Sequence, residues 1–105
     1  MSRMNEIAAK YGEDYLLRQL AEECSELSQA ALKLIRANRK ETPMRPEEAV
    51  EHLIEEIADV TVMLKGVYDT MFDPPMMDAV NDIHIEKVAR MYDRLLDGKM
   101  EEDVW

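Results

Sequence analysis

The sequence predicts a single all-α domain over residues 1–105, folded as an antiparallel four-helix bundle, and three observations carry this prediction. Apolar residues recur at steps of three and four along three long segments, which is the spacing of one helix face. Only three glycines and four prolines are present, so few turns interrupt these segments. Hydrophobic residues make up 47% of the sequence, and a chain of 105 residues is long enough to form one domain with a single core.

The first part of the chain is expected to hold a short helix followed by a long one. Residues 2–11 are amphipathic, with Ser2 placed to cap the helix and Gly12 to end it. Residues 13–38 form the long helix. Its predicted apolar stripe is Leu16, Leu20, Cys24, Leu27, Ala31 and Leu34. A single thiol inside this stripe fits a reducing cytoplasm and excludes a disulfide framework.

The third helix is predicted over residues 46–71, after a polar linker at 39–46 that reverses the chain. Pro46 suits the first position of a helix. The predicted apolar stripe is Val50, Leu53, Ile54, Ile57, Thr61, Leu64, Tyr68 and Met71. Further apolar residues are Val60, Val62, Met63 and Val67. They make this segment apolar nearly all round, which predicts a homo-oligomer interface, in a homodimer or homotetramer.

The fourth helix is predicted over residues 76–97, with Asp73 before it as a cap and Gly98 as its stop. Its predicted stripe is Met77, Val80, His84, Val88, Met91 and Leu95. Two interpretations of the acidic tail stay open. It is either disordered, or its terminal Trp105 packs into a neighbouring subunit.

Two acidic motifs on the long helices are the candidate functional residues. They are Glu23-x-x-Glu26 and Glu56-x-x-Asp59. Residues three apart on a helix are about 60° apart around its axis, so each motif points two carboxylates the same way. If the helices pack side by side, four carboxylates converge, and only cations make that tolerable. Oxygen ligands favour hard cations, so we expect Mg²⁺, with Mn²⁺ as a possible substitute.

The neighbouring charges are less informative. Glu22 falls nearly opposite the apolar stripe of its helix, and Glu55 also points away from the stripe of its own helix. Lys87 and Arg94 are seven residues apart, hence on one side of their helix. They either bind an anionic ligand group or only flank the core. His52 is expected to be exposed and His84 to lie in the core, and neither receives a role.

The composition excludes several classes of function. The net charge of −10, without a basic patch, argues against a nucleic acid partner. No apolar run is long enough to span a membrane, and no signal peptide is recognisable, so we expect a cytoplasmic protein. A di-iron bundle needs Glu-x-x-His pairs, which neither histidine supplies.

The acidic motifs in their apolar context resemble those of the MazG-like, all-α nucleotide pyrophosphohydrolase family. The residues that carry the resemblance are Glu22-Glu23-x-x-Glu26-Leu27 and Glu55-Glu56-Ile57-Ala58-Asp59-Val60, and the similarity covers about residues 13–95. The resemblance implies Mg²⁺-dependent cleavage of a nucleoside triphosphate into monophosphate and pyrophosphate, as in house-cleaning of nucleotide pools. It also implies assembly into dimers or tetramers.

The resemblance further implies roles for individual residues. The metal ligands would be Glu23, Glu26, Glu56 and Asp59. Glu22 and Glu55 would act as catalytic bases or support the ligands, and Lys87 and Arg94 would bind substrate phosphate. Two alternatives are a phosphoribosyl-ATP pyrophosphohydrolase and a non-enzymatic acidic adaptor whose Met-rich face binds a partner helix.

Overall fold

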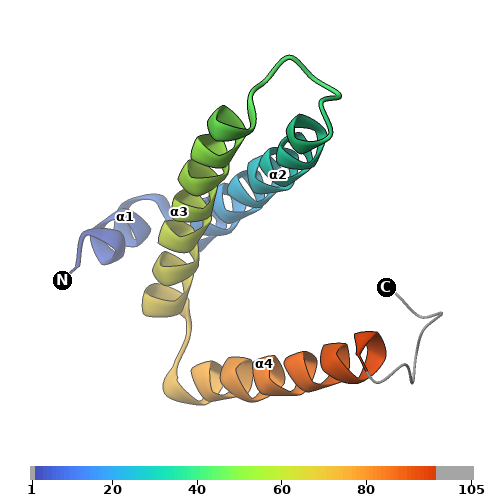
Figure 1. Cartoon of the computed structure of the whole chain (residues 1–105). Coiled ribbons are helices and arrows are strands. Elements are labelled where there is room, and N and C mark those ends of the chain that lie inside the picture. The colour runs from blue at the N-terminus through green and yellow to red at the C-terminus, as the bar shows by residue number, and fades with distance from the viewer. Residues whose placement is uncertain (1, 97–105) are drawn as a thin grey trace. The chain divides into compact units, whose positions relative to one another are not determined.

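A computed structural model describes residues 2–96, and over this range the regular secondary structure is α-helical, without strands. The helices are α1 (Arg3–Tyr11), α2 (Glu13–Asn38), α3 (Pro46–Met71) and α4 (Pro74–Leu95) (Figure 1). The predicted helices are confirmed, with α4 starting two residues earlier than expected. None of these helices combines the length and the apolar character that crossing a bilayer requires.

The chain divides into two units, residues 1–71 and 72–105, which are described separately. The first unit contains α1, α2 and α3, and the described part of the second contains α4. The prediction of one domain and one bundle over residues 1–105 therefore stays a prediction. The expected stop at Gly98 and the expected packing of Trp105 lie outside the described residues.

Helix ends follow the capping residues that the sequence offers. The Ser2 side chain accepts a hydrogen bond from the Asn5 backbone N–H (3.1 Å), and Asp73 does the same for Met76 (2.9 Å). Gly12 joins α1 to α2 with φ of 90°, a conformation that residues with a Cβ rarely adopt.

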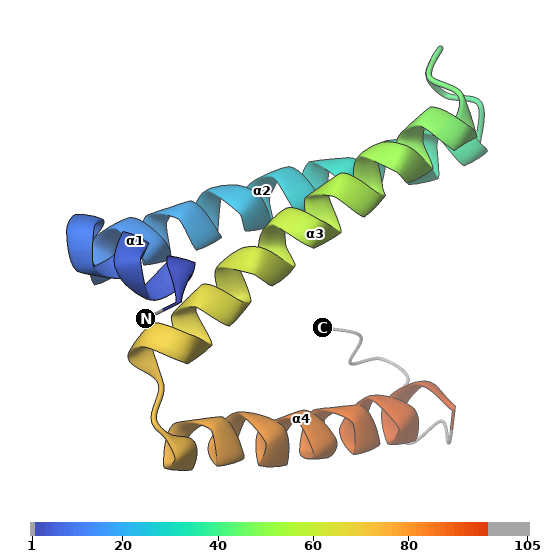
Figure 2. The same ribbon diagram turned by 90° about the vertical axis from the view of Figure 1, so that its left-hand side faces the viewer.

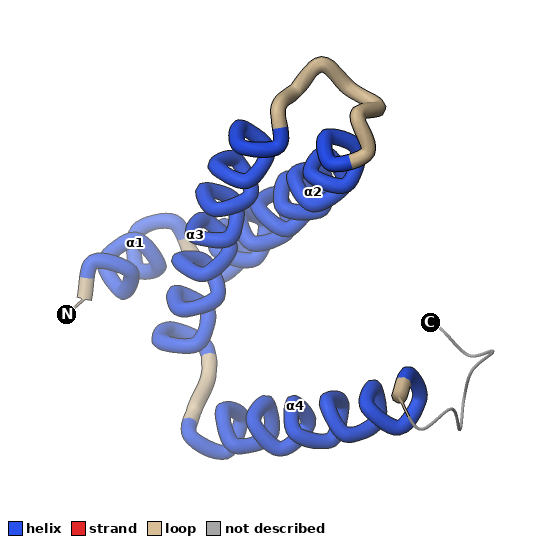
Figure 3. Tube along the Cα trace, viewed as in Figure 1, coloured by secondary structure: helices blue, strands red, loops and turns tan. Residues whose placement is uncertain are grey.

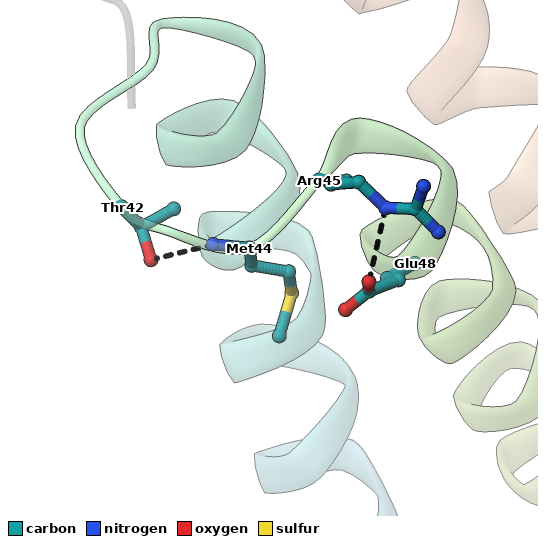
Figure 4. Close-up of polar contacts among 4 residues, drawn as sticks. All are labelled: Thr42, Met44, Arg45 and Glu48. Carbon is teal, nitrogen blue, oxygen red and sulfur yellow. Dashed lines mark hydrogen bonds and ion pairs between the residues drawn. The ribbon is translucent and has the colours of Figure 1, made fainter.

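The loop between α2 and α3 is compact and makes the two helices antiparallel neighbours (Figures 2 and 3). The Met44 backbone N–H donates to Thr42 Oγ1 (3.4 Å). Arg45 Nε lies 3.1 Å from Glu48 Oε1, an exposed ion pair at the start of α3 (Figure 4). These local contacts set the direction in which α3 returns along α2.

The residues that α2 and α3 turn toward each other repeat at alternating steps of four and three. This seam consists of Leu16, Leu20, Glu23, Leu27, Ala30, Leu34 and Ala37 on α2, and Ala49, Leu53, Glu56, Val60, Met63 and Val67 on α3. All are buried or half-buried. Such a seven-residue repeat keeps one face of each helix against its partner. Each helix therefore carries one glutamate inside its packed seam.

The seam differs from the predicted apolar stripes of α2 and α3, of which six residues are exposed: Cys24 and Ala31 on α2, and Val50, Ile54, Ile57 and Thr61 on α3. Cys24 and Ala31 are exposed, whereas the neighbouring Glu23 is half-buried and Ala30 is fully buried. On α3, Ile54 (60% exposed) and Ile57 (48%) lie outside the seam. Small alanines occupy the seam, which lets the two helix backbones approach closely. A prediction based on hydrophobicity alone gives most weight to the larger side chains, so it assigns residues on the wrong face of each helix to the core.

The proposed interface residues Val60 and Val67 also have another role than expected. Both are buried within the chain, so neither is available to a second copy, although Val62 remains 54% exposed. Most seam-plus-one positions, the residues that directly follow a seam residue, are exposed instead, whereas Leu64 and Tyr68 are half-buried. The large apolar residues among the exposed ones are Leu17, Ile35, Val50, Ile54 and Ile57.

α1 packs against both α2 and α3. Gly66 of α3 lies directly under the Met4 side chain, and a Cβ at this position would collide with the end of that side chain. α4 has no buried residue, and His84 is exposed rather than in a core. Among the described residues of its unit, α4 is the single helix, so no second described element covers its apolar stripe.

Candidate metal centre

The four predicted ligands come together between α2 and α3. Glu23, Glu26, Glu56 and Asp59 each offer one carboxylate oxygen, and these atoms all lie within 4.8 Å of one another. We call these four residues the acid cluster. Two of its members are in the seam, and each of the other two lies three positions further along the same helix. The predicted convergence of the two motifs is therefore confirmed.

The placement of the acid cluster follows from helix geometry. A step of three residues turns a side chain by about 60° away from the seam, whereas a step of one turns it by about 100° in the opposite sense. Because α2 and α3 run antiparallel, equal rotations lead to the same side of the hairpin. Glu26 and Asp59 thus define one side, the acid side. The seam-plus-one residues define the opposite side, the apolar side.

Glu56 is the most enclosed member of the acid cluster. Its residue is 7% exposed, which makes it the single buried charged residue among residues 2–96. Its Oε2 atom is inaccessible and has no hydrogen-bond partner, and the same is true of Oε2 in half-buried Glu23. Buried carboxylate oxygens without a donor or a cation are energetically costly.

The lysines and arginines of residues 2–71 do not neutralise this charge. Within residues 2–71, no lysine or arginine forms an ion pair with the acid cluster. The ion pairs of Arg45 and Lys65 are made with Glu48 and Asp69. Within residues 2–71, the basic side chain that contacts the cluster is His52, whose Nε2 lies 3.4 Å from Glu56 Oε1. The site thus keeps an excess of negative charge.

Crowding changes the proton affinity of the two seam acids. Burial is the largest effect that raises the pKa of Glu23 above its usual 4.5, followed by repulsion from Glu26, Asp59 and Glu56 and by a hydrogen bond with Asp59. Burial likewise raises the pKa of Glu56, with repulsion from Glu26 and Asp59 and a hydrogen bond with Glu26 adding to it, while His52 lowers it. Each of these hydrogen bonds joins two carboxyl groups, so it requires that one of the pair is protonated. When both are ionised neither can donate, and the Oε2 atoms of Glu23 and Glu56 have no partner.

These features fit a divalent cation with oxygen ligands. The donor set is entirely carboxylate, which suits Mg²⁺, Mn²⁺ or Ca²⁺ rather than Zn²⁺. Oxygens on opposite sides of one Mg²⁺ lie about 4.1 Å apart. The spread of 4.8 Å in the acid cluster is therefore within reach of small side-chain rotations. The two partnerless Oε2 atoms are the positions that a cation would satisfy.

The other predicted site residues are not members of the acid cluster. Glu22 and Glu55 are exposed and do not belong to the group of four. Gln19 Nε2 donates a hydrogen bond to Glu22 Oε2 (3.4 Å). Lys87 and Arg94 lie on α4, in the second unit. Their assigned roles stay predictions.

The sequence did not lead us to predict a functional role for His52. It is half-buried rather than exposed, because it lies one turn before Glu56 on the side that faces the acid cluster. The signal was available as a His–Glu pair at positions i and i+4, which are neighbours on a helix surface.

No family model, curated protein or solved structure matches this chain in the comparisons with known proteins.

Proposed function

We propose that this chain is a Mg²⁺-dependent nucleoside triphosphate pyrophosphohydrolase, a hydrolase that acts on acid anhydrides in the cytoplasmic nucleotide pool. Mn²⁺ would substitute for Mg²⁺. The observation that carries the proposal is the buried, partnerless Oε2 of Glu56 inside a cluster of four carboxylates. The motif resemblance supports the choice of nucleotides as substrates.

In this proposal the enclosed and the exposed members of the acid cluster have different roles. Glu23 and Glu56 anchor the cation from within the seam, and Glu26 and Asp59 bind it at the exposed rim, where a polyphosphate can approach. The bound cation would neutralise phosphate charge and favour the attack of water. Cleavage breaks the anhydride bond between the α and β phosphates and releases pyrophosphate.

The remaining residues would act around the cation. Glu22 or Glu55 would accept the proton of the attacking water, since both carboxylates are solvent-exposed next to a seam acid. Lys87 and Arg94 would bind substrate phosphate.

The test is a panel of nucleoside and deoxynucleoside triphosphates incubated with the full chain and Mg²⁺. We expect at least one to yield monophosphate and pyrophosphate. Glu56→Gln should abolish this turnover, whereas the control Glu51→Gln, an exposed acid on the same helix, should keep it. Stepwise release of orthophosphate, or turnover that persists in excess chelator, would refute the proposed reaction.

The apolar side supports a second element of the proposal, assembly into a homodimer or homotetramer. Its large side chains lie on both helices of one hairpin, so a second copy related by a two-fold axis would present the same stripe in return. Four helices would then enclose a shared core. The acid side would stay open to substrate.

An acidic helical adaptor is the second candidate function, and the same exposed apolar side favours it. In that case the apolar side would bind a helix of another protein. An adaptor has no need for a cation, so it predicts no stabilisation by Mg²⁺ or Mn²⁺.

A further inference from the structure

We propose that His52 is a positioning residue for the metal centre, holding the Glu56 carboxylate so that its second oxygen is directed into the acid cluster. This inference rests on the proposed function, because it assumes that the cluster binds a cation.

The contact that carries the inference joins the imidazole to one oxygen of the buried acid. His52 Nε2 lies 3.4 Å from Glu56 Oε1, while Oε2 of the same carboxylate has no partner. The two carboxylate oxygens of Glu56 therefore have different surroundings. One faces an imidazole nitrogen, and the other is left for a ligand.

His52 itself is not a member of the acid cluster. The group whose ligand atoms lie within 4.8 Å of one another consists of four carboxylates and omits the imidazole. His52 therefore acts on a cation only through Glu56. Hydrogen-bond partners behind ligating side chains fix their orientation, and removing such a partner typically lowers metal affinity about 10–100-fold.

The surroundings make Glu56 the member that depends most on such a partner. No lysine or arginine within residues 2–71 pairs with it, and at 7% exposure little water is available to orient it. Exposed Glu26 and Asp59 can be oriented by water instead. A rigid carboxylate at the buried end of the site fixes where a cation sits before the rim residues close on it.

The variants separate this role from helix packing. His52→Leu removes the ring nitrogen, His52→Gln keeps an N–H donor of similar reach, and His84→Leu is the control on the other histidine. Mn²⁺ affinity of each full-length variant is measured by electron paramagnetic resonance of free Mn²⁺, without nucleotide. We expect His52→Leu to weaken binding about 10–100-fold. His52→Gln should stay within about threefold of the unmodified chain, and His84→Leu should match it.

The outcomes distinguish failure of the metal centre from failure of the positioning role of His52 alone. If the unmodified chain does not bind Mn²⁺, the metal centre fails, and the role of His52 fails with it. If the unmodified chain binds and His52→Leu binds equally well, only the positioning role is overturned. Equal losses in the Leu and Gln variants would also overturn it, because they would indicate a packing effect.

A second measurement on the unmodified chain covers the case in which His52→Leu does not fold. Side-chain ¹⁵N resonances report which ring nitrogen of a neutral histidine carries the proton. The spectra are recorded at about pH 8, where a free imidazole is neutral. We expect His52 to be held as the Nε2–H tautomer and to respond to Mg²⁺, with no response at His84. A His52 that is mainly Nδ1–H, or that does not respond to Mg²⁺, would overturn the proposal.

Discussion

The two sides of the α2–α3 hairpin present different kinds of group that lack an interaction partner. The acid cluster, which opens on the acid side, holds two carboxylate oxygens that lack a partner, and the apolar side exposes large hydrophobic side chains that lack a cover. Both sides are built on the same two helices and are separated only by the direction of rotation from the seam. Under the proposed function, one hairpin would serve two kinds of partner, a cation on one side and a second chain on the other.

The largest expected effect comes from removing one charge of the acid cluster. Glu56→Gln should lower turnover by more than about a hundredfold, since it removes a ligand rather than a supporting partner. The apolar side is untouched, so the association state should not change. Steady-state kinetics and light scattering on the same sample check both parts. A variant that loses assembly together with activity would break the separation of the two sides.

The reverse substitution places a charge on the apolar side. Ile57→Glu should weaken self-association at least about a hundredfold, because an unpaired carboxylate would be buried in each contact. Mn²⁺ binding should persist, since Ile57 points away from the acid cluster. Sedimentation at micromolar concentrations provides the check, with Val62→Ser as a matched control outside the apolar side. A monomeric unmodified chain would contradict the proposed assembly.

How far the sequence predicts these two sides can be judged from particular residues. Glu23-x-x-Glu26 and Glu56-x-x-Asp59 are recognisable because a three-residue spacing has a fixed angular meaning on a helix. Helix ends were predictable from Ser2, because a cap is a local interaction.

The assignment of faces failed because packing depends on shape as well as hydrophobicity. Ala30 and Ala49 are weak hydrophobic signals, yet both are fully buried. Their small size brings the helices close, and the larger Ile54 and Ile57 are then left outside. His52 was missed for a related reason, since its significance depends on the burial of Glu56. Neither fact is encoded in the spacing of one helix alone.

A smaller effect concerns pH and the metal-free protein. The pKa of both Glu23 and Glu56 is raised in the folded chain. A raised folded pKa contributes stability that is fully present below the usual value of 4.5 and is lost as pH rises through the folded pKa. Without metal, the melting temperature should therefore fall as pH increases above about 4.5. The fall should be shallower in Glu56→Gln, which removes one of the two groups.

Metal should counter this loss. Because binding releases protons from the carboxyl groups, the rise in melting temperature caused by Mn²⁺ should grow over the same pH range. Thermal melts from pH 4.5 to 8, with chelator or with Mn²⁺, test both trends. A metal-free melting temperature that rises with pH equally in both proteins would contradict the assigned pKa directions.

The smallest expected effect is on the rate of thiol labelling at Cys24, which reports on the apolar side. Cys24 follows seam residue Glu23 directly, and its thiol is exposed in the single chain. If a second copy covers the apolar side, thiol labelling should be several-fold slower at high protein concentration than in the Ile57→Glu variant. Labelling rates that are equal in the two proteins would place the interface elsewhere.

The most direct test of the metal centre is thermal melting of the unmodified chain, Asp59→Asn and the control Glu51→Gln, each with chelator and with Mn²⁺. Removing one of four crowded charges should raise the metal-free melting temperature of Asp59→Asn by roughly 5 °C, the shift that about 1 kcal/mol produces in a domain of this size. The same variant should lose most of the stabilisation that Mn²⁺ gives the unmodified chain, while Glu51→Gln keeps it. If Asp59→Asn melts no higher without metal and retains the full Mn²⁺ shift, the acid cluster is not the metal centre.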